Sequence, residues 1–336
     1  ASGAGIYVYE NGLRVLGALG ALGEAIEGAS LAQTREVHDS SGNLVSVHRW
    51  GATGRVYSIT RQRLIDALAS AARAAGADIV LRSTGVAATP AGELTLESGE
   101  RLTADLVVAA DGVNSRLRDG LGLLARRSEM ADGAIRVLID KTAEERAAGD
   151  GGKTIETWSG TRRVLLTPCS ESEIYVALTM LDRDEAAKRV PIDVAAWSSW
   201  FPHLAPLLAR IGPEGRYDRF SYVRLKRWSA GRVAVIGDAA HAMPPNIGQG
   251  GGCAMMNALA LATWLGEGRD VGEALTEWER KERPLTAHTQ RFSLLMGKPT
   301  TWPRPLQRGF FNLVGRSRFM GEMRSRTARH IPTGTV

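Results

Sequence analysis

Cysteine is scarce in this chain of 336 residues, which contains only Cys169 and Cys253. Two cysteines cannot form the disulfide framework of a small secreted domain, so a reducing, cytoplasmic setting is expected. Long apolar runs are also missing: no stretch of about 18 residues is free of both charge and glycine, and no transmembrane helix is predicted. Residues 1–5 lack the basic and apolar segments of a signal peptide, so none is expected.

Lysine is rare, and the 42 basic residues are mostly arginine; 36 acidic residues leave a net charge of +6. No dense basic run is present, so neither nucleic acid nor a membrane is an expected partner. Arginine binds phosphate and carboxylate groups in a bidentate manner, which suits an anionic cofactor or substrate, although most of these side chains also fit a solvated basic surface. The 44% hydrophobic content indicates an ordinary globular protein with two domains, or one large domain with insertions.

Hydrophobic periodicity predicts both helices and strands along the chain. Asn11 and Thr60 are the expected N-caps of the first two helices. The predicted helices span residues 11–26, 62–75, 192–211 and 254–265. Apolar runs at 104–110 and 232–236 are typical of strands buried on both faces of a parallel sheet. The other predicted strands are a short strand at 78–82, a hairpin region at 86–102 and an alternating, antiparallel region at 133–180.

These elements predict an α/β protein in which a doubly wound parallel sheet carries an inserted antiparallel-sheet domain and C-terminal helices. The predicted units are a first part of the parallel-sheet domain at 1–132, the inserted domain at 133–228, the second part at 229–290 and a C-terminal helical extension at 291–336.

Two aspartates follow the predicted buried strands. Asp111-Gly112 ends one strand and Gly237-Asp238 ends the other. Open α/β sheets bind ligands at the carboxyl ends of their strands, and a carboxylate there accepts hydrogen bonds from a sugar or polyol. The glycines of residues 248–252 precede a helix, whose unpaired N–H groups would stabilise negative charge. The alternative for each site is a purely structural strand-turn-helix junction in which the acid caps the helix.

Residues 107–118 (VVAADGVNSRLR) and 231–258 (GRVAVIGDAAHAMPPNIGQGGGCAMMNA) resemble the second and third FAD motifs of the class A flavoprotein aromatic hydroxylases, the para-hydroxybenzoate hydroxylase fold group. The resemblance covers most of residues 3–285 and is strongest to the 2-methyl-3-hydroxypyridine-5-carboxylate oxygenases. That family opens with a β-α-β unit and a G-x-G-x-x-G turn, which this sequence lacks. We expect the unit to precede residue 1 rather than to be deleted, since its removal would expose apolar sheet edges.

The resemblance implies an FAD-binding sheet and an FAD-dependent monooxygenase of aromatic catabolism that uses NADH or NADPH and O₂. It would hydroxylate, or also ring-open, a small aromatic or pyridine carboxylic acid. The enzyme would use no metal, and an oligomer is compatible with the resemblance. The alternatives are a reductase or halogenase of the same fold, or a flavin-free binding module. The residues implied to hold FAD are Arg61, Asp111, Gly112, Asp238, Pro245, Gly248, Gly250, Gly251 and Gly252.

The substrate pocket is expected between the flavin and the inserted sheet. Its candidate residues are Tyr7, Arg136, Arg163 and Tyr175. The tyrosines would supply hydroxyl groups and ring packing, and the arginines would clamp a carboxylate or a phenolate. Pro245, by resemblance beside the reactive carbon of the flavin, joins Tyr175 and Arg163 as a catalytic candidate. The alternative is that tyrosines and arginines on an antiparallel sheet form a solvated face.

Overall fold

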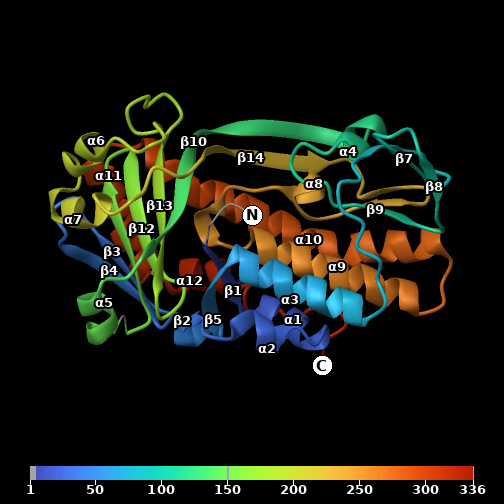
Figure 1. The fold of residues 1–336 in the computed structure, drawn as a ribbon, viewed down its shortest axis with the longest axis horizontal. Coiled ribbons are helices and arrows are strands. Elements are labelled where there is room, and N and C mark those ends of the chain that lie inside the picture. Colours follow the sequence, from blue (N-terminus) through green and yellow to red (C-terminus); the bar gives the residue numbers. More distant parts are fainter. Residues whose placement is uncertain (1–4, 150, 336) are drawn as a thin grey trace.

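The computed structural model describes residues 5–149 and 151–335. The molecule is elongated, with a large sheet at one end and helices with small sheets at the other (Figure 1). Two long strands, β10 (Leu124–Asp140) and β14 (Tyr217–Leu225), pair with each other and run between the two ends. This pair, whose register shifts at two places, therefore connects the two regions.

The large sheet has seven strands in the order β14-β10-β13-β12-β11-β3-β4. Its other members are β3 (Thr34–His38), β4 (Leu44–Arg49), β11 (Lys153–Ser159), β12 (Arg162–Pro168) and β13 (Glu173–Leu181). The antiparallel strands predicted over 133–180 are confirmed. The sequence did not indicate that β3 and β4 would join them, because β3 pairs with β11 in parallel across more than a hundred residues of chain.

One face of the large sheet is covered by short helices around the fully buried Trp197. The single helix predicted over 192–211 is wrong in detail. Prolines at 202 and 206 remove backbone donors and divide the segment. It forms α6 (Val194–Ser198), the 3₁₀ turn η2 (Pro202–Leu204) and α7 (Ala205–Leu208).

At the opposite end, a small sheet has the order β15-β16-β9, and its β16–β9 pair is parallel. Its strands are β9 (Val107–Ala109), β15 (Ser229–Ala230) and β16 (Val233–Val235). Both predicted buried strands thus exist, but burial on both faces is wrong for β9, because Val108 is 43% exposed. The strand predicted at 78–82 does not form; no described strand lies beside it to complete a hydrogen-bonded ladder.

Beneath β10 and β14 lie α1 (Glu10–Ala18), α2 (Leu22–Ile26), α3 (Arg61–Ala74), α9 (Gly250–Gly266) and α10 (Val271–Gly297) (Figure 1). The other helices are α4 (Arg116–Gly120), α8 (Gly237–His241), α11 (Arg304–Arg316) and α12 (Arg318–Ser325). Thr60 caps α3 as predicted, accepting a hydrogen bond from the Arg63 backbone N–H at 3.3 Å. Asn11 is not a cap: it lies buried inside α1, and its Nδ2 donates to Gln249 Oε1 at 3.1 Å.

Two further sheets complete the fold. The strands β1 (Gly5–Tyr9), β5 (Val56–Thr60) and β2 (Ser30–Leu31) form one of them. The other consists of β6 (Gly85–Ala88), β7 (Glu93–Leu96) and β8 (Arg101–Thr103), which confirms the predicted hairpin region. The predicted domain boundaries stay a prediction, although β10 passes without a break through the one at residues 132–133. In the described part of the chain, no helix is both long and apolar enough to cross a membrane.

Candidate active site

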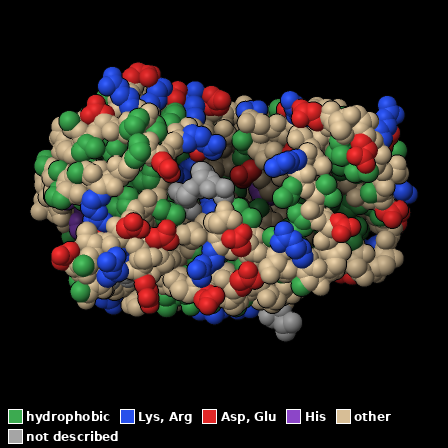
Figure 2. Space-filling view, in the orientation of Figure 1, with side chains coloured by type: hydrophobic (Ala, Val, Ile, Leu, Met, Phe, Trp, Pro, Cys, Tyr) green, Lys and Arg blue, Asp and Glu red, His purple; other side chains and the backbone are tan. Residues whose placement is uncertain are grey.

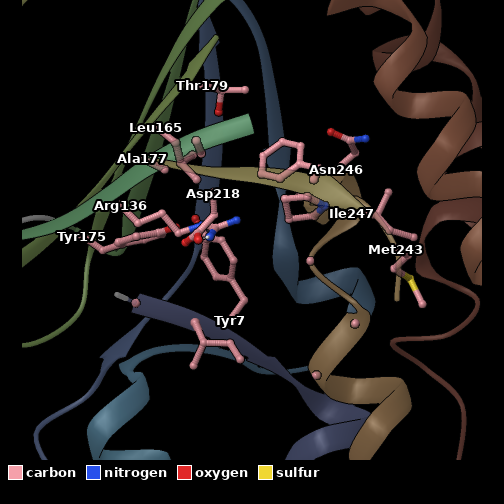
Figure 3. A pocket seen from close by; sticks show the side chains of 18 of the residues that line it. Tyr7, Arg136, Leu165, Tyr175, Ala177, Thr179, Asp218, Met243, Asn246 and Ile247 are labelled. Carbon is pink, nitrogen blue, oxygen red and sulfur yellow. Dashed lines mark ion pairs between the residues drawn. The ribbon is translucent and has the colours of Figure 1, made fainter. Parts of the chain in front are cut away.

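A cavity of about 410 Å³ opens between the large sheet and the start of α9. Its walls come from β1, from six strands of the large sheet (β3, β10, β11, β12, β13 and β14), from the loop before α9 and from α12. Figure 2 shows the surface hollowed between the two ends of the molecule, with acidic and basic side chains around the hollow. In Figure 3, Tyr7 lies between the strand residue Tyr175 and the loop residue Ile247, so the cavity joins sheet and loop.

The loop before α9 is shaped by glycine. A 3₁₀ turn, η3 (Pro245–Ile247), leads to Gly248, whose φ of +65° is in the left-handed region that favours glycine. Gly250 and Gly251 then start α9 and line the cavity. A Cβ on Gly250 would have no neighbour closer than 4.0 Å, so the first turn of this 17-residue helix is open toward the cavity. Its free N–H groups can therefore face a ligand.

Asp238, in the first turn of α8, lines the same cavity. Its carboxylate has surface open to the cavity but is enclosed by protein on its other sides, and this burial raises its pKa, while the Arg61 guanidinium acts in the opposite direction. Arg61 also lines the cavity. Among the described residues, Asp238 has neither a hydrogen-bond nor an ion-pair partner within bonding distance, so its acceptor oxygens are available to a ligand.

Three predicted cofactor residues lie outside the cavity wall. Asp111 instead accepts a hydrogen bond from the Leu117 backbone N–H, at 3.4 Å from Oδ2. Gly112 has a φ of +82° and open space where a Cβ would be. A Cβ on Gly252 would lie 3.0 Å from Asn11 Nδ2, so this glycine permits the close packing of α1 against α9. Their roles toward FAD stay predictions, and packing already accounts for Gly252.

On the sheet side, Tyr7, Tyr175 and Arg136 line the cavity together, and their roles toward a substrate stay predictions. Burial raises the pKa of Tyr7 and of Tyr175, so both phenols are neutral donors at ordinary pH. The Arg136 guanidinium lies within hydrogen-bond reach of Tyr175 and forms an ion pair with Asp218 at 3.6 Å. These residues are therefore not a solvated face.

Arg163 also lines the cavity, but it is already engaged by the protein. Its Nη1 donates to Glu156 Oε1 at 3.1 Å and its Nη2 donates to Thr179 Oγ1 at 3.3 Å. Glu156, only 2% exposed, also forms an ion pair with Arg35. Sequence reasoning missed Arg35 and Glu156; the available signal was a charged residue, Glu156, two positions from Thr154 and therefore on the same face of β11.

Arg324 reaches the cavity from α12, far from the other lining residues in the sequence. Its guanidinium lies over the Trp50 ring, 5.7 Å from the ring centre, and Trp50 meets Tyr9 edge-on at 5.7 Å. Tyr9 in turn donates to the Ile247 carbonyl at 3.2 Å. This aromatic group connects α12 to the glycine loop, and no sequence motif pointed to it.

The chemistry of this wall fits a flavin. An unpartnered acid suits polyol hydroxyls, Arg61 suits phosphate, and the open start of α9 suits negative charge on a reduced heterocycle. The Asn246 side chain is engaged with α10, where its Nδ2 donates to the Ser293 carbonyl at 3.0 Å. Among residues 5–149 and 151–335, no group of three or more His, Cys, Asp or Glu side chains is arranged to hold a metal ion.

Comparisons with known proteins agree with this geometry. The family model described as an FAD binding domain matches residues 11–293. AqdB1 of Rhodococcus erythropolis, named for 2-heptyl-3-hydroxy-4(1H)-quinolone synthase activity, is 40% identical over 337 aligned positions, which cover 99% of this chain and 88% of AqdB1. The 2-heptyl-3-hydroxy-4(1H)-quinolone synthase of Mycobacteroides abscessus is 40% identical over 321 positions, covering 94% of this chain and 85% of that protein.

A solved structure is similar along the whole chain. The tetrameric form of 2-methyl-3-hydroxypyridine-5-carboxylic acid oxygenase superposes with a TM-score of 0.88 at 38% identity, covering 100% of this chain and 88% of that one. Klebsiella pneumoniae HpxO, solved with FAD and uric acid, has a TM-score of 0.78 at 24% identity, covers 97% and 87% of the two chains, and shows the fold alone.

Proposed function

This chain belongs to the FAD-binding domain family of flavin-dependent monooxygenases, and we propose that it oxygenates a nitrogen-containing aromatic ring that carries an oxygen substituent. The quinolone and the hydroxypyridine in the names of its relatives share that chemistry. One observation carries the proposal: a single cavity is lined both by the glycine-opened start of α9 and by Tyr7, Tyr175 and Arg136 of the sheet side. Cofactor and ring would thus meet in one enclosed space.

The loop and helix residues account for cofactor binding. When bound, FAD is reduced by NADH or NADPH and delivers one oxygen atom of O₂ to the ring. Asp238 accepts hydrogen bonds from the ribityl hydroxyls, and Arg61 lies close enough to act on the charge of Asp238. The N–H groups at Gly250 and Gly251 stabilise negative charge at the edge of the reduced ring. Pro245 lines the wall between this helix start and the sheet side.

The sheet residues orient the substrate. Tyr175, held neutral by burial, presents its hydroxyl group beside apolar lining residues such as Leu165 and Phe220. The Tyr7 hydroxyl is bonded to Thr154 and Thr167, so Tyr7 contributes its ring to the wall. A ring oxygen hydrogen-bonded to Tyr175 is held in one orientation, which favours reaction at the neighbouring carbon. Arg136, between Tyr175 and Asp218, fixes the Tyr175 hydroxyl. The enclosed wall also excludes water from the reacting ring.

The test is ring-stimulated consumption of NADH or NADPH by the FAD-loaded protein, with the product analysed for one oxygen atom from ¹⁸O₂. A 2-alkyl-4(1H)-quinolone and a 3-hydroxypyridine carboxylate are the two ring probes. Tyr175→Phe should lower kcat/KM about three- to tenfold, the value of one hydrogen bond. Tyr222→Phe is the matched control, because Tyr222 is buried on β14 away from the cavity wall. Reduction of the ring without oxygen incorporation would refute the proposal.

A further inference from the structure

Three guanidinium groups and one carboxylate lie in the part of the cavity wall built by the large sheet and α12. Arg35 and Arg163 both pair with Glu156, and Arg324 lines the same cavity. Burial lowers the pKa of Arg35, and the neighbouring Arg324 and Arg163 guanidiniums lower it further, so the three charges act on one another. Counting these four side chains, the group carries a surplus of two positive charges, part of which Asp132 offsets at Arg163.

Arg324 is the member of this group without an anion. Within the described residues, no carboxylate lies at ion-pair distance from it, and its recorded contact is with the face of Trp50. Elsewhere on the same helix, the exposed Arg318 pairs with Glu322 at 3.1 Å. A buried cation is costly unless it is paired, and a contact with an aromatic face offsets only part of that cost. The structure thus holds Arg324 ready for an anionic group.

The two arginines predicted to clamp a substrate carboxylate are less available. Arg136 is in contact with Asp218 and Phe220, and Arg163 is bonded to Glu156 and Thr179. Building on the proposed function, we infer that the substrate ring carries a carboxylate and that Arg324, supported by Arg35, binds it next to Trp50. Arg324 would then determine specificity while Tyr7 and Tyr175 hold the ring.

The competing occupant is an alkyl tail. Beyond Arg35 and Arg324 lies a second hollow of about 80 Å³. Its apolar walls are formed by Val37, Val47, Met296, Val314 and Met320. Since both arginines line the main cavity and this hollow, they lie between the two. A tail entering there would have to pass two charged groups, whereas a carboxylate would neutralise them, and we therefore favour the carboxylate.

The experiment compares ring probes that differ at one substituent: 4-oxo-1H-quinoline-2-carboxylate, its 2-carboxamide and 2-heptyl-4(1H)-quinolone. Binding to the FAD-loaded protein is measured by calorimetry for the wild type, Arg324→Gln, Arg324→Lys and the same-helix control Arg318→Gln. We expect the wild type and Arg318→Gln to bind the acid about 10- to 100-fold more tightly than the amide. Arg324→Gln should abolish that preference, and Arg324→Lys should keep part of it.

The ratio of acid to amide affinity is informative because a general loss of folding lowers both affinities together. Equal affinity for acid and amide in the wild type, no measurable binding of the acid, or a preference that survives Arg324→Gln overturns the inference. If the heptyl probe binds more tightly than the acid, and its affinity is unchanged in Arg324→Gln, the inference is also overturned and the second hollow is assigned to an alkyl tail. Turnover is scored separately: a preserved acid preference without oxygenation of any ring refutes the proposed function and not the carboxylate site.

Discussion

Asp238→Asn should change affinity for FAD and stability of the FAD-free protein in opposite directions. The carboxylate lines the cavity without a partner among the described residues, and burial raises its pKa. A folded-state pKa above the unfolded value means that stability is lost as pH rises through the folded pKa, because the ionised form is disfavoured in the fold. The amide removes that penalty, so the FAD-free variant should unfold at a slightly higher temperature than the wild type at pH 7; the gain is small because the Asp238 side chain is exposed to the cavity.

The same substitution removes a charged acceptor for the ribityl hydroxyls. A hydrogen bond to a charged group contributes about 1.5–3 kcal/mol, which corresponds to a loss of FAD affinity of about 10- to 150-fold. Flavin fluorescence titration measures this loss, and thermal unfolding without FAD measures the stability gain. Asp78→Asn is the control, since Asp78 is exposed outside the cavity wall, and it should change neither quantity. Wild-type FAD affinity in Asp238→Asn would show that the acid does not hold the cofactor.

Three further perturbations follow from the structure. Gly248→Ala and the control Gly268→Ala both replace a glycine at positive φ, so each should lower the free energy of unfolding in urea by about 1–2 kcal/mol. Only Gly248→Ala should also weaken FAD binding, because its Cβ would lie 3.0 Å from Tyr9 Oη. Glu156→Gln should destabilise by about 3–5 kcal/mol by leaving two buried cations unpaired, whereas the exposed-pair control Glu322→Gln should cost under about 1 kcal/mol. Burial lowers the pKa of His241 to about 4, so the free energy of unfolding should fall by up to about 3 kcal/mol as pH falls from 6.5 to 4. In His241→Gln, unfolding measured over the same pH range should lack this contribution.

Local features were predictable because their causes lie within a few residues. The Thr60 cap is set by one hydroxyl and the N–H three residues later, and the hairpin at 86–102 by its turns. The positions of Asp238 and of the glycines before and at the start of α9 are also set locally, by the strand-turn-helix junction that contains them, while their roles toward FAD stay predictions. Resemblance then supplied the cofactor, which composition and periodicity alone left open.

Features that depend on distant partners were missed. An apolar run at 78–82 reads as a strand, but a strand needs a neighbour to pair with, and no described strand lies beside it. Asn11 has the residue type of a helix cap, yet its contact with Gln249 across more than two hundred residues draws it inside α1. Arg35 and Arg324 carry no motif at all, because only the parallel β3–β11 pair and the return of α12 bring them to one wall.

In the part of the chain that the structure describes, the cavity wall contains one predicted and one missed charged side chain that both lack a protein counterion. Asp238 offers an acceptor and Arg324 a donor, and neither has a protein counterion within bonding distance among the described residues. A side chain that is enclosed and unpaired lowers stability unless a ligand supplies the missing group. The two are placed differently: Asp238 shares its surroundings with Arg61, while Arg324 acts on Tyr9 and Arg35. A cofactor polyol and a substrate carboxylate would therefore bind separate parts of one wall. A substrate ring whose carboxylate is bound at Arg324 would then lie in a single orientation relative to the cofactor.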